Sequence, residues 1–163
     1  MNSVQKQVVL GTLLGNGHLN KGSLAIVHSL EDLPWLKTKG RLLEDYTFNL
    51  DIGEKNCVWR SIQDLFFIKL RTVCYKDNKK SITMDWLNQL TDVGLSVFFG
   101  DKGEVINNHA IIHSNNPILE TYFNEVGMPC KLENNITFTI EGTKKLINMV
   151  CQVLPPNRYH KLK

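Results

Sequence analysis

The chain has 163 residues, of which 42% are hydrophobic, and its formal net charge at pH 7 is +3. This length and apolar content suit one compact domain or two fused halves that share a core. The first apolar run is short and is interrupted by Gly11 and Gly15, so we expect neither a signal peptide nor a membrane span. The weak positive charge does not by itself identify a nucleic-acid-binding protein.

The first half predicts three helices and two hairpins. A helix over residues 3–14, capped by Ser3, ends at Gly15 and Gly17. The turn signal Asn20-Lys21-Gly22 predicts a hairpin of residues 18–19 and 23–28. The remaining expected elements are a helix over 33–46, a hairpin of 48–51 and 56–61, and a helix over 64–75.

The second half repeats this order. The expected elements are a helix over 84–99, a hairpin of 104–105 and 110–113 across Asn107-Asn108, a helix over 117–126, a hairpin of 131–132 and 136–140, and a helix over 143–154. Each half therefore has an αββαββα order with one antiparallel sheet. Such a sheet packs helices on one face and leaves the other to solvent or ligand, so the predicted fold class is α+β.

An internal repeat connects the two halves. Leu24–Ser29 is echoed by His109–Ser114 at a spacing of about 85 residues, which makes His28 and His113 equivalent. A repeat of this length indicates two similar half-domains, about residues 1–80 and 81–163, within one domain over residues 1–163. A nearly two-fold ligand such as duplex DNA fits this arrangement.

Four features, taken together and in order, resemble one known family. Residues 10–19 and 93–105 each contain an apolar helical run that breaks at a glycine. Residues 78–83 (Asn-Lys-Lys-Ser-Ile-Thr) resemble a Lys-Lys-x-Ile-Pro segment, and residues 154–162 resemble a closing Pro-x-x-x-Tyr-Lys-Leu segment. With these features, nearly the whole chain resembles the LAGLIDADG homing endonucleases in their two-motif, single-chain form.

The resemblance implies a fold and a mode of action. The two motif helices would form the central interface, and two saddle-shaped antiparallel sheets would lie along the DNA major groove. An acidic residue at the end of each motif helix would hold a divalent metal ion, magnesium, at the scissile phosphates. The small residues expected to let the helices approach closely are Gly11, Gly15, Gly94, Ser96 and Gly100.

The sequence departs from the family at the catalytic positions. The residue before the final glycine of each motif is Asn16 in the first copy and Lys102 in the second. Divalent metals prefer charged oxygen ligands, whereas Asn16 offers a neutral carbonyl and Lys102 a cation. Asp101, one residue off this register, is the one candidate metal ligand. We therefore expect little or no cleavage, with Lys102 facing Asn16 and contacting Asn16, Asp101 or a phosphate.

Residues suited to nucleic-acid binding remain. Lys80 and Lys161 match positions that the family keeps basic near the scissile phosphates, and solvated surface lysines are the alternative interpretation. Polar strand residues on exposed sheet faces can contact base edges and phosphates. The candidates are His18, Asn20, Lys21, Ser23, Lys55, Trp59, Arg60, Glu104, Asn108, His109, Asn134, Thr137 and Thr139.

Histidines and tryptophans each allow two interpretations. The equivalence of His28 and His113 suggests a paired metal or catalytic role, but neither has a ligand-spaced Cys, Asp or Glu, which favours hydrogen-bonded structural residues. Trp35 and Trp86 lie in predicted helices and are expected in the core. Trp59 lies on a strand and stacks on a base if it is exposed.

Cysteine spacing and amino-acid composition both give information about the cellular setting. Cys57, Cys74, Cys130 and Cys151 form no Cys-x-x-Cys pair, so we expect reduced thiols in an intracellular protein. Abundant Asn and Lys indicate an AT-rich coding genome, and the mitochondrion, the chloroplast, a phage-infected cell and the bacterial cytoplasm stay open.

Three functional hypotheses follow. The first is a nucleic-acid-binding protein that has lost cleavage and acts as a maturase, a ribosome-associated component (in a ribonucleoprotein) or a regulator, on duplex DNA or structured RNA. The second is an active homing endonuclease that makes a magnesium-dependent double-strand break. The third is a protein–protein interaction module on the same scaffold. The first needs no cofactor for binding, and we expect a monomer without a membrane partner.

Overall fold

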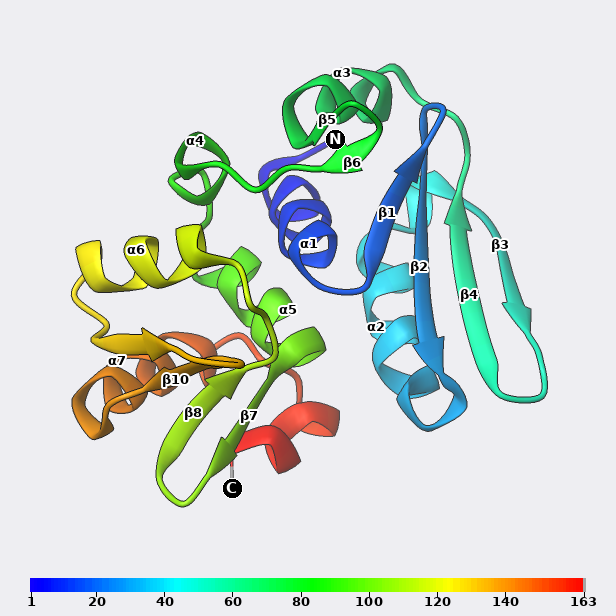
Figure 1. The fold of residues 1–163 in the computed structure, drawn as a ribbon. Helices are drawn as coiled ribbons and strands as arrows, with labels where there is room; N and C mark the ends of the chain where they lie inside the picture. Colours follow the sequence, from blue (N-terminus) through cyan, green and yellow to red (C-terminus); the bar gives the residue numbers. More distant parts are fainter. Residues whose placement is uncertain (163) are drawn as a thin grey trace.

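The computed structural model describes residues 1–162 and contains two four-stranded antiparallel sheets, each with helices packed on one face (Figure 1). The predicted α+β fold is confirmed. The elements of the first half are α1 Ser3–Leu14, β1 Gly17–Asn20, β2 Ser23–Ser29, η1 Leu30–Asp32, α2 Leu33–Leu42, η2 Glu44–Tyr46, β3 Thr47–Ile52, β4 Asn56–Ser61 and α3 Leu65–Cys74.

A short hairpin of β5 and β6 joins the halves, and a second αββαββα unit follows it. The elements are β5 Tyr75–Lys76, β6 Lys79–Lys80, α4 Met84–Leu87, α5 Asp92–Lys102, β7 Gly103–Ile106, β8 His109–Ile112, α6 Pro117–Glu125, β9 Cys130–Leu132, β10 Ile136–Phe138, α7 Ile140–Val150 and η3 Pro156–Leu162.

The two sheets share one strand order. It is β1-β2-β4-β3 in the first, called sheet N, and β7-β8-β10-β9 in the second, called sheet C. In both, the second strand of each hairpin lies at the centre of the sheet. The β7–β8 hairpin turns at Asn107 and Asn108, whose φ values are 51° and 66°. Asparagine tolerates this left-handed region, which a two-residue hairpin turn requires.

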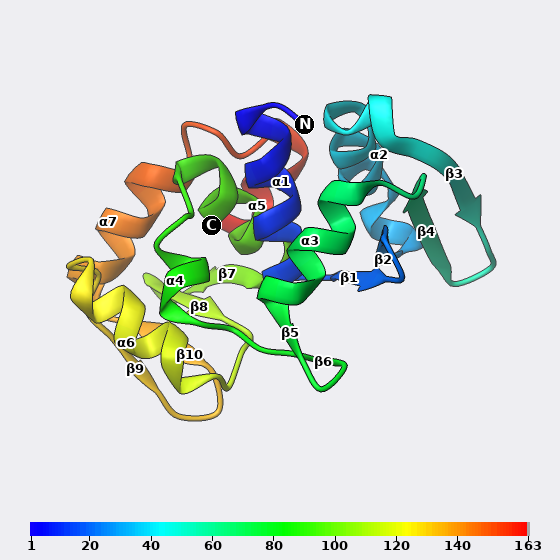
Figure 2. The same ribbon diagram turned by 90° about the horizontal axis from the view of Figure 1, so that it is seen from above.

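Helices α1 and α5 pack side by side between the two sheets (Figure 2). Their contact has no room for side chains at two points. A Cβ atom on Gly11 would lie 2.2 Å from the carbonyl oxygen of Gly94, and one on Gly15 would lie 2.4 Å from Oδ2 of Asp101. Glycine therefore permits this helix pairing, and the predicted adjacency of the two motif helices is confirmed.

Two of the five small residues have other neighbours. The Ser96 hydroxyl lies 2.6 Å from the carbonyl oxygen of Asp92 and 3.4 Å from that of Val150, at the end of α7. A Cβ atom on Gly100 would meet the Trp35 ring at 3.0 Å. The prediction that Ser96 and Gly100 line the helix pair is therefore wrong, because both residues lie on other faces of α5.

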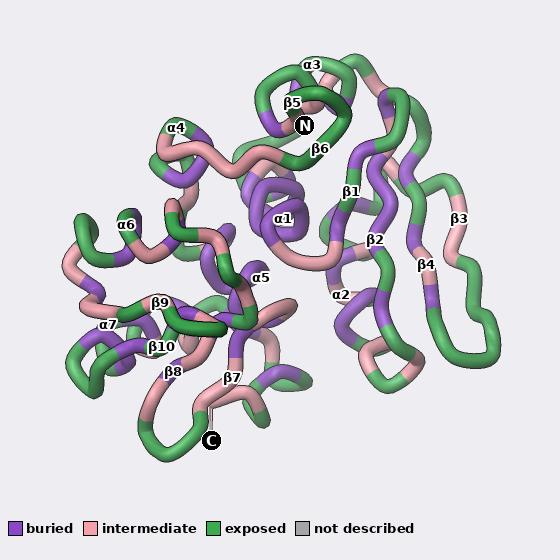
Figure 3. The backbone as a smooth tube through the Cα atoms, viewed as in Figure 1, coloured by how far each residue is buried: buried purple, intermediate pink, exposed green. Residues whose placement is uncertain are grey.

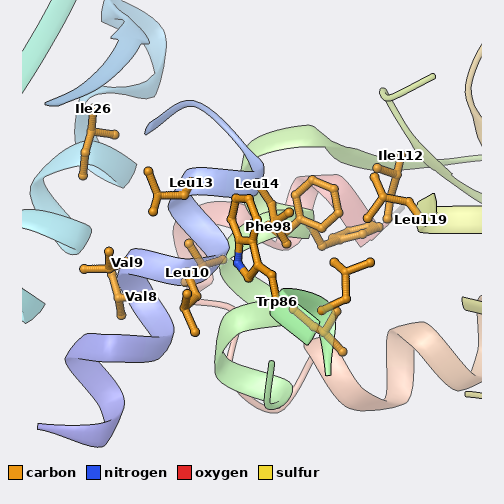
Figure 4. Packing of buried hydrophobic residues seen from close by; sticks show 14 of the residues in the cluster. Val8, Val9, Leu10, Leu13, Leu14, Ile26, Trp86, Phe98, Ile112 and Leu119 are labelled. Carbon is orange, nitrogen blue, oxygen red and sulfur yellow. The ribbon is translucent and has the colours of Figure 1, made fainter. Parts of the chain in front are cut away.

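One core surrounds the helix pair. Figure 3 shows α1 buried along most of its length, and Figure 4 shows side chains of both halves packed together. Leu13 and Phe98 come from the two helices, while Ile26 and Ile112 come from the two sheets. Trp86 is also fully buried. No helix within residues 1–162 is long and apolar enough to cross a membrane.

Several predicted boundaries are wrong, and capping contacts explain them. The helix expected over 84–99 is interrupted, because the side-chain oxygen of Gln7 accepts a hydrogen bond from the Thr91 backbone N–H at 2.8 Å, just before α5 begins. The strand expected to reach Ile140 ends at Phe138, because Thr139 caps α7. The cap of α1 is Asn2 rather than Ser3.

The structure aligns the two copies of the internal repeat one residue away from the alignment predicted from the sequence. Gly17 pairs with Ile26 in sheet N, and Gly103 pairs with Ile112 in sheet C, so Val27 rather than His28 is equivalent to His113. A shift of one residue moves a strand side chain to the opposite face. His28 accordingly points into the core, whereas His113 is exposed, and their predicted equivalence is wrong.

The glycine contact between α1 and α5 yields a stability prediction. The Gly11→Ala variant should lower the free energy of unfolding by about 1–3 kcal/mol or more, because its methyl group overlaps the Gly94 carbonyl. Chemical denaturation measures the change. The control is Gly53→Ala, whose Cβ atom would meet only the Asn56 carbonyl oxygen at 3.3 Å. Equal stability of wild type and Gly11→Ala would contradict this packing.

Candidate nucleic-acid interface

The outer face of sheet N, which lies opposite α2, carries a row of polar side chains. Strand pairing aligns His18 with Ala25, Ala25 with Arg60, and Arg60 with Asn49. The Arg60 guanidinium forms an ion pair with Asp51, and the side-chain amide of Asn49 donates to the same carboxylate at 2.9 Å. Within residues 1–162 the Arg60 guanidinium has no hydrogen-bond partner other than Asp51.

The outer face of sheet C also carries polar side chains. Pairing aligns Glu104 with Ile111, Ile111 with Thr137, and Thr137 with Lys131. Glu104 lies 2.6 Å from Nε2 of the exposed His113. A ring nitrogen of His109 lies 2.7 Å from the carbonyl oxygen of Phe138. The two faces therefore carry charges of both signs, Arg60 with Asp51 on sheet N, and Glu104 with Lys131 on sheet C.

The other predicted binding residues lie at the edges of these faces. Asn20 and Ser23 flank the β1–β2 turn, and the Ser23 hydroxyl donates to the Asn20 carbonyl at 2.9 Å. Thr139 caps α7. Four candidates lie in exposed hairpin turns, namely Lys21, Lys55, Asn108 and Asn134.

Trp59 does not belong to this surface. Only 2% of the residue is exposed, and its indole N–H donates to the Thr47 hydroxyl at 3.2 Å on the core side of sheet N. The alternation of side chains along β4 places Arg60 on one face and Trp59 on the other. The prediction that Trp59 contacts nucleic acid is therefore wrong.

Basic groups gather between the sheets, where α1 and α5 end. The Lys80 ammonium donates to the Gly17 carbonyl at 2.8 Å. Partial desolvation, followed by the neighbouring Lys102 ammonium, lowers the pKa of Lys80. Burial, followed by Lys80 and Arg60, lowers the pKa of His18. Burial is the main cause of both shifts, and the smaller contributions from Lys102, Lys80 and Arg60 come from positive charges that lie close together at the centre of the outer surface. Lys161 belongs to η3, which contacts β7 and α2.

Asp101 lies in a buried polar cluster behind this surface. Its side chain is 0% exposed, and its carboxylate accepts hydrogen bonds from the Lys39 ammonium at 2.8 and 3.0 Å and from the Trp35 indole at 2.6 Å. The backbone N–H of Asn16 donates to Oδ2 of Asp101 at 3.2 Å. Lys39 and Trp35 belong to α2, so the cluster links the two halves of the chain.

His28 and Arg158 complete the buried cluster. Nε2 of His28 lies 2.8 Å from the Lys39 ammonium. Burial, and then the Lys39 charge, lowers the pKa of His28 to about 4, while the carboxylates of Asp101 and Asp32 oppose the shift. The Arg158 guanidinium, from η3, bonds Asp32 at 2.6 Å. His28 is thus a neutral, hydrogen-bonded residue. This agrees with the structural role that the sequence favoured over a metal or catalytic role.

The geometry does not fit the metal ion that the resemblance implies. Both oxygens of Asp101 are bonded to Lys39, and the Asn16 side-chain amide lies 3.4 Å from a His28 ring nitrogen. Within residues 1–162, no three His, Cys, Asp or Glu side chains are grouped to hold a metal ion. The prediction of Asp101 as a metal ligand therefore lacks structural support, since both of its carboxylate oxygens are already bonded to the Lys39 ammonium.

Lys102 contacts neither of the two side chains expected as its partners, Asn16 and Asp101, and contact with a phosphate stays a prediction. Asn16 and Lys102 do occupy equivalent positions, because their carbonyl oxygens accept from the N–H groups of Val27 and His113. However, Asp101 bonds Lys39 instead of Lys102, and Asn16 turns toward His28. Among the described residues Lys102 has no ion-pair partner within 4.0 Å, so its ammonium is available to an external anion.

Sequence reasoning missed the partners of Asp101. A lysine four residues after Trp35, on the apolar side of a helix, was the available signal for Lys39. Asp32 and Arg158 carried no recognisable signal, because they are far apart in sequence and meet only through the return of η3 to α2.

Comparison with known proteins decides the family. The sequence profile of the LAGLIDADG DNA endonuclease family matches residues 6–152. The chain belongs to this family. The match spans both motif helices and both sheets, and the resemblance read from the sequence is confirmed. No curated protein sequence matches significantly.

Solved structures share the LAGLIDADG fold seen here. The homing endonuclease I-WcaI, bound to its DNA recognition sequence, is 18% identical with a TM-score of 0.83, over 99% of this chain and 87% of that one. I-DmoI in complex with DNA and Mn is 12% identical with a TM-score of 0.58, over 91% and 96%. The N-terminal LAGLIDADG domain of DUF199/WhiA is 11% identical with a TM-score of 0.55, over 91% and 81%.

The buried histidine yields a pH prediction. The unfolded chain binds a proton on His28 near pH 6.5, whereas the native state does so only near pH 4. Native stability should therefore fall as the pH is lowered from 6.5 to 4, by up to about 3 kcal/mol from this group.

Urea denaturation of wild type and His28→Gln at several pH values tests this prediction. The variant should show a shallower loss of stability between pH 6.5 and 4, because it has no imidazole to protonate. Identical slopes for the two proteins would show that His28 has the same pKa in the native and unfolded states, which would contradict the prediction.

Proposed function

We propose that this protein binds a long DNA duplex across the outer faces of both sheets and does not cleave it by a metal-dependent mechanism. I-WcaI is bound to its DNA recognition sequence and I-DmoI to DNA and Mn, and both share this fold. This likeness supports placing a duplex on the corresponding surface of the present chain.

The sheet faces have suitable groups for reading DNA. The major groove of B-form DNA admits β-strands, and Arg, Asn and Gln side chains hydrogen-bond to its base edges. Arg60 in the first row, and Glu104, Thr137 and Lys131 in the second, supply side chains that can hydrogen-bond to base edges from two separate sheets. The major groove of A-form RNA is too deep and narrow for this mode of reading, which favours DNA over RNA duplex.

The burial of Asp101 and its pairing with Lys39 are the main support for the proposed loss of cleavage. Metal-assisted phosphodiester hydrolysis requires carboxylates beside the phosphate. The Asp101 carboxylate is buried and paired with Lys39, while the positions before the final glycines hold Asn16 and Lys102. The centre offers Lys80 and Lys102 to a phosphate, so it suits anion binding in place of metal binding.

Of the three hypotheses, a nucleic-acid-binding protein without cleavage agrees best with the structure of the centre. An active endonuclease would need Asp101 to leave Lys39 and turn outward, which leaves a buried ammonium unpaired at a cost of about 3–5 kcal/mol. A protein-interaction module does not account for polar rows on both sheet faces. A binding protein without cleavage fits a regulator of DNA, a maturase or a ribosome-associated component, and preference for duplex DNA over structured RNA separates these roles.

Binding and cleavage assays test the proposal together. Wild type should retard labelled genomic duplex fragments with or without Mg²⁺ or Mn²⁺, should bind structured RNA more weakly, and should leave both DNA strands intact. Binding should weaken as salt rises, because lysine–phosphate contacts release counterions.

Two outcomes would contradict the proposal. Metal-dependent double-strand cleavage that disappears in Asp101→Asn, while DNA binding by that variant is kept, would establish the active endonuclease. Tight binding of structured RNA with no affinity for duplex DNA would instead assign the surface to RNA.

A further inference from the structure

We propose that the β5–β6 hairpin, residues 75–80 and here called the arm, contacts the phosphate backbone of a bound duplex between the two sheets. This inference rests on the proposed function and adds to it a contact surface outside both sheets. Neither the polar rows nor the ends of α1 and α5 include the tip of the arm.

The arm projects from the body of the protein on the side where α1 and α5 end. Figure 2 shows it extending past β1 and β2 in that direction, between sheet N and sheet C. Its turn residues Asp77 and Asn78 have φ values of 50° and 61°, as a two-residue hairpin turn requires. A duplex lying across both sheets would pass beside this turn.

The arm is fixed to sheet N by specific contacts. The Tyr75 hydroxyl accepts a hydrogen bond from the Leu19 backbone N–H at 2.9 Å. The Arg71 guanidinium stacks over the Tyr75 ring at 4.5 Å and donates to the Asn78 side chain at 3.0 Å. Such bracing holds the arm in place before any ligand arrives, which reduces the entropy lost on binding.

Two lysines are directly opposed at the tip of the arm. Lys76 pairs with Lys79, and Tyr75 pairs with Lys80. Because Tyr75 and Lys80 contact β1, the pleat turns Lys76 and Lys79 to the opposite face. Both are exposed, and neither has an ion-pair partner within 4.0 Å among residues 1–162.

Opposed like charges destabilise a hairpin in the absence of a counter-ion. Two ammonium groups held across from one another, on a braced arm, therefore match an anion that lies between them or along them. Ammonium groups bind phosphate as point charges without a fixed geometry, so the contact would be independent of base sequence. Lys80 and Lys102, further in, continue the positive charge toward the centre.

Salt-dependent binding of the full-length protein tests the arm. The variant carries Lys76→Gln and Lys79→Gln, and its matched control carries Lys37→Gln and Lys144→Gln. The control makes the same change in charge at exposed residues of α2 and α7, which cover the other faces of the sheets. The probe is a labelled random-sequence duplex long enough to span both sheets, and circular dichroism verifies that both variants are folded.

The arm variant should lose about tenfold or more in affinity at moderate salt. Its negative slope of log K against log salt should become shallower by about 1.8, since each lost phosphate contact contributes about 0.9 to the steepness. The control should retain the wild-type slope. A duplex-binding wild type whose slope is unchanged by the arm variant would overturn the arm alone, whereas a wild type that binds no duplex would overturn the proposed function and the arm with it.

Discussion

The proposed function depends on the buried ion pair between Lys39 and Asp101. Both side chains are 0% exposed, and the pair joins α2 of the first half to α5 of the second. Taking two charges out of water is costly, and the hydrogen bonds from Trp35 and Asn16 to the carboxylate help to offset that cost. The pair therefore holds the carboxylate on the inner side of the helix ends.

This pairing separates two properties that the family fold combines. The scaffold of two sheets around a helix pair remains, with the close contact of Gly11 and Gly94 at its centre. The carboxylate that would attract a divalent metal is instead neutralised by an internal cation. The outer surface at the same place carries Lys80 and Lys102, which attract phosphate and repel metal ions. The proposal of binding without cleavage rests on this retained shape and altered charge.

The sequence predicted the fold well because its signals were local and repeated. Glycine-ended helical runs and asparagine turns specify the helix pair and the hairpins, and these signals appear in both halves. Register was predicted less well. Alignment of the repeat by sequence identity made His28 equivalent to His113. The pairing of Gly17 with Ile26, and of Gly103 with Ile112, shifts that alignment by one residue. Trp59 was misplaced because alternation along β4 has two possible phases, and only packing against α2 chooses between them.

The site was predicted in part. Asn16 and Lys102 were found from the motifs, since the equivalence of their positions follows from local sequence. The buried cluster was not found, because Lys39 and Asp101 are 62 positions apart and Asp32 meets Arg158 only through the return of the chain. Contacts of this kind depend on how the two halves dock, and no local pattern encodes them.

The most direct measurement is a crystal structure of the protein with a bound duplex, grown in the presence of Mn²⁺ and examined by anomalous scattering. The present account predicts that Asp101 still bonds Lys39, that no Mn²⁺ lies at the ends of α1 and α5, and that a phosphate approaches Lys80 and Lys102. A manganese ion coordinated by Asp101, with Lys39 displaced from it, would contradict the account.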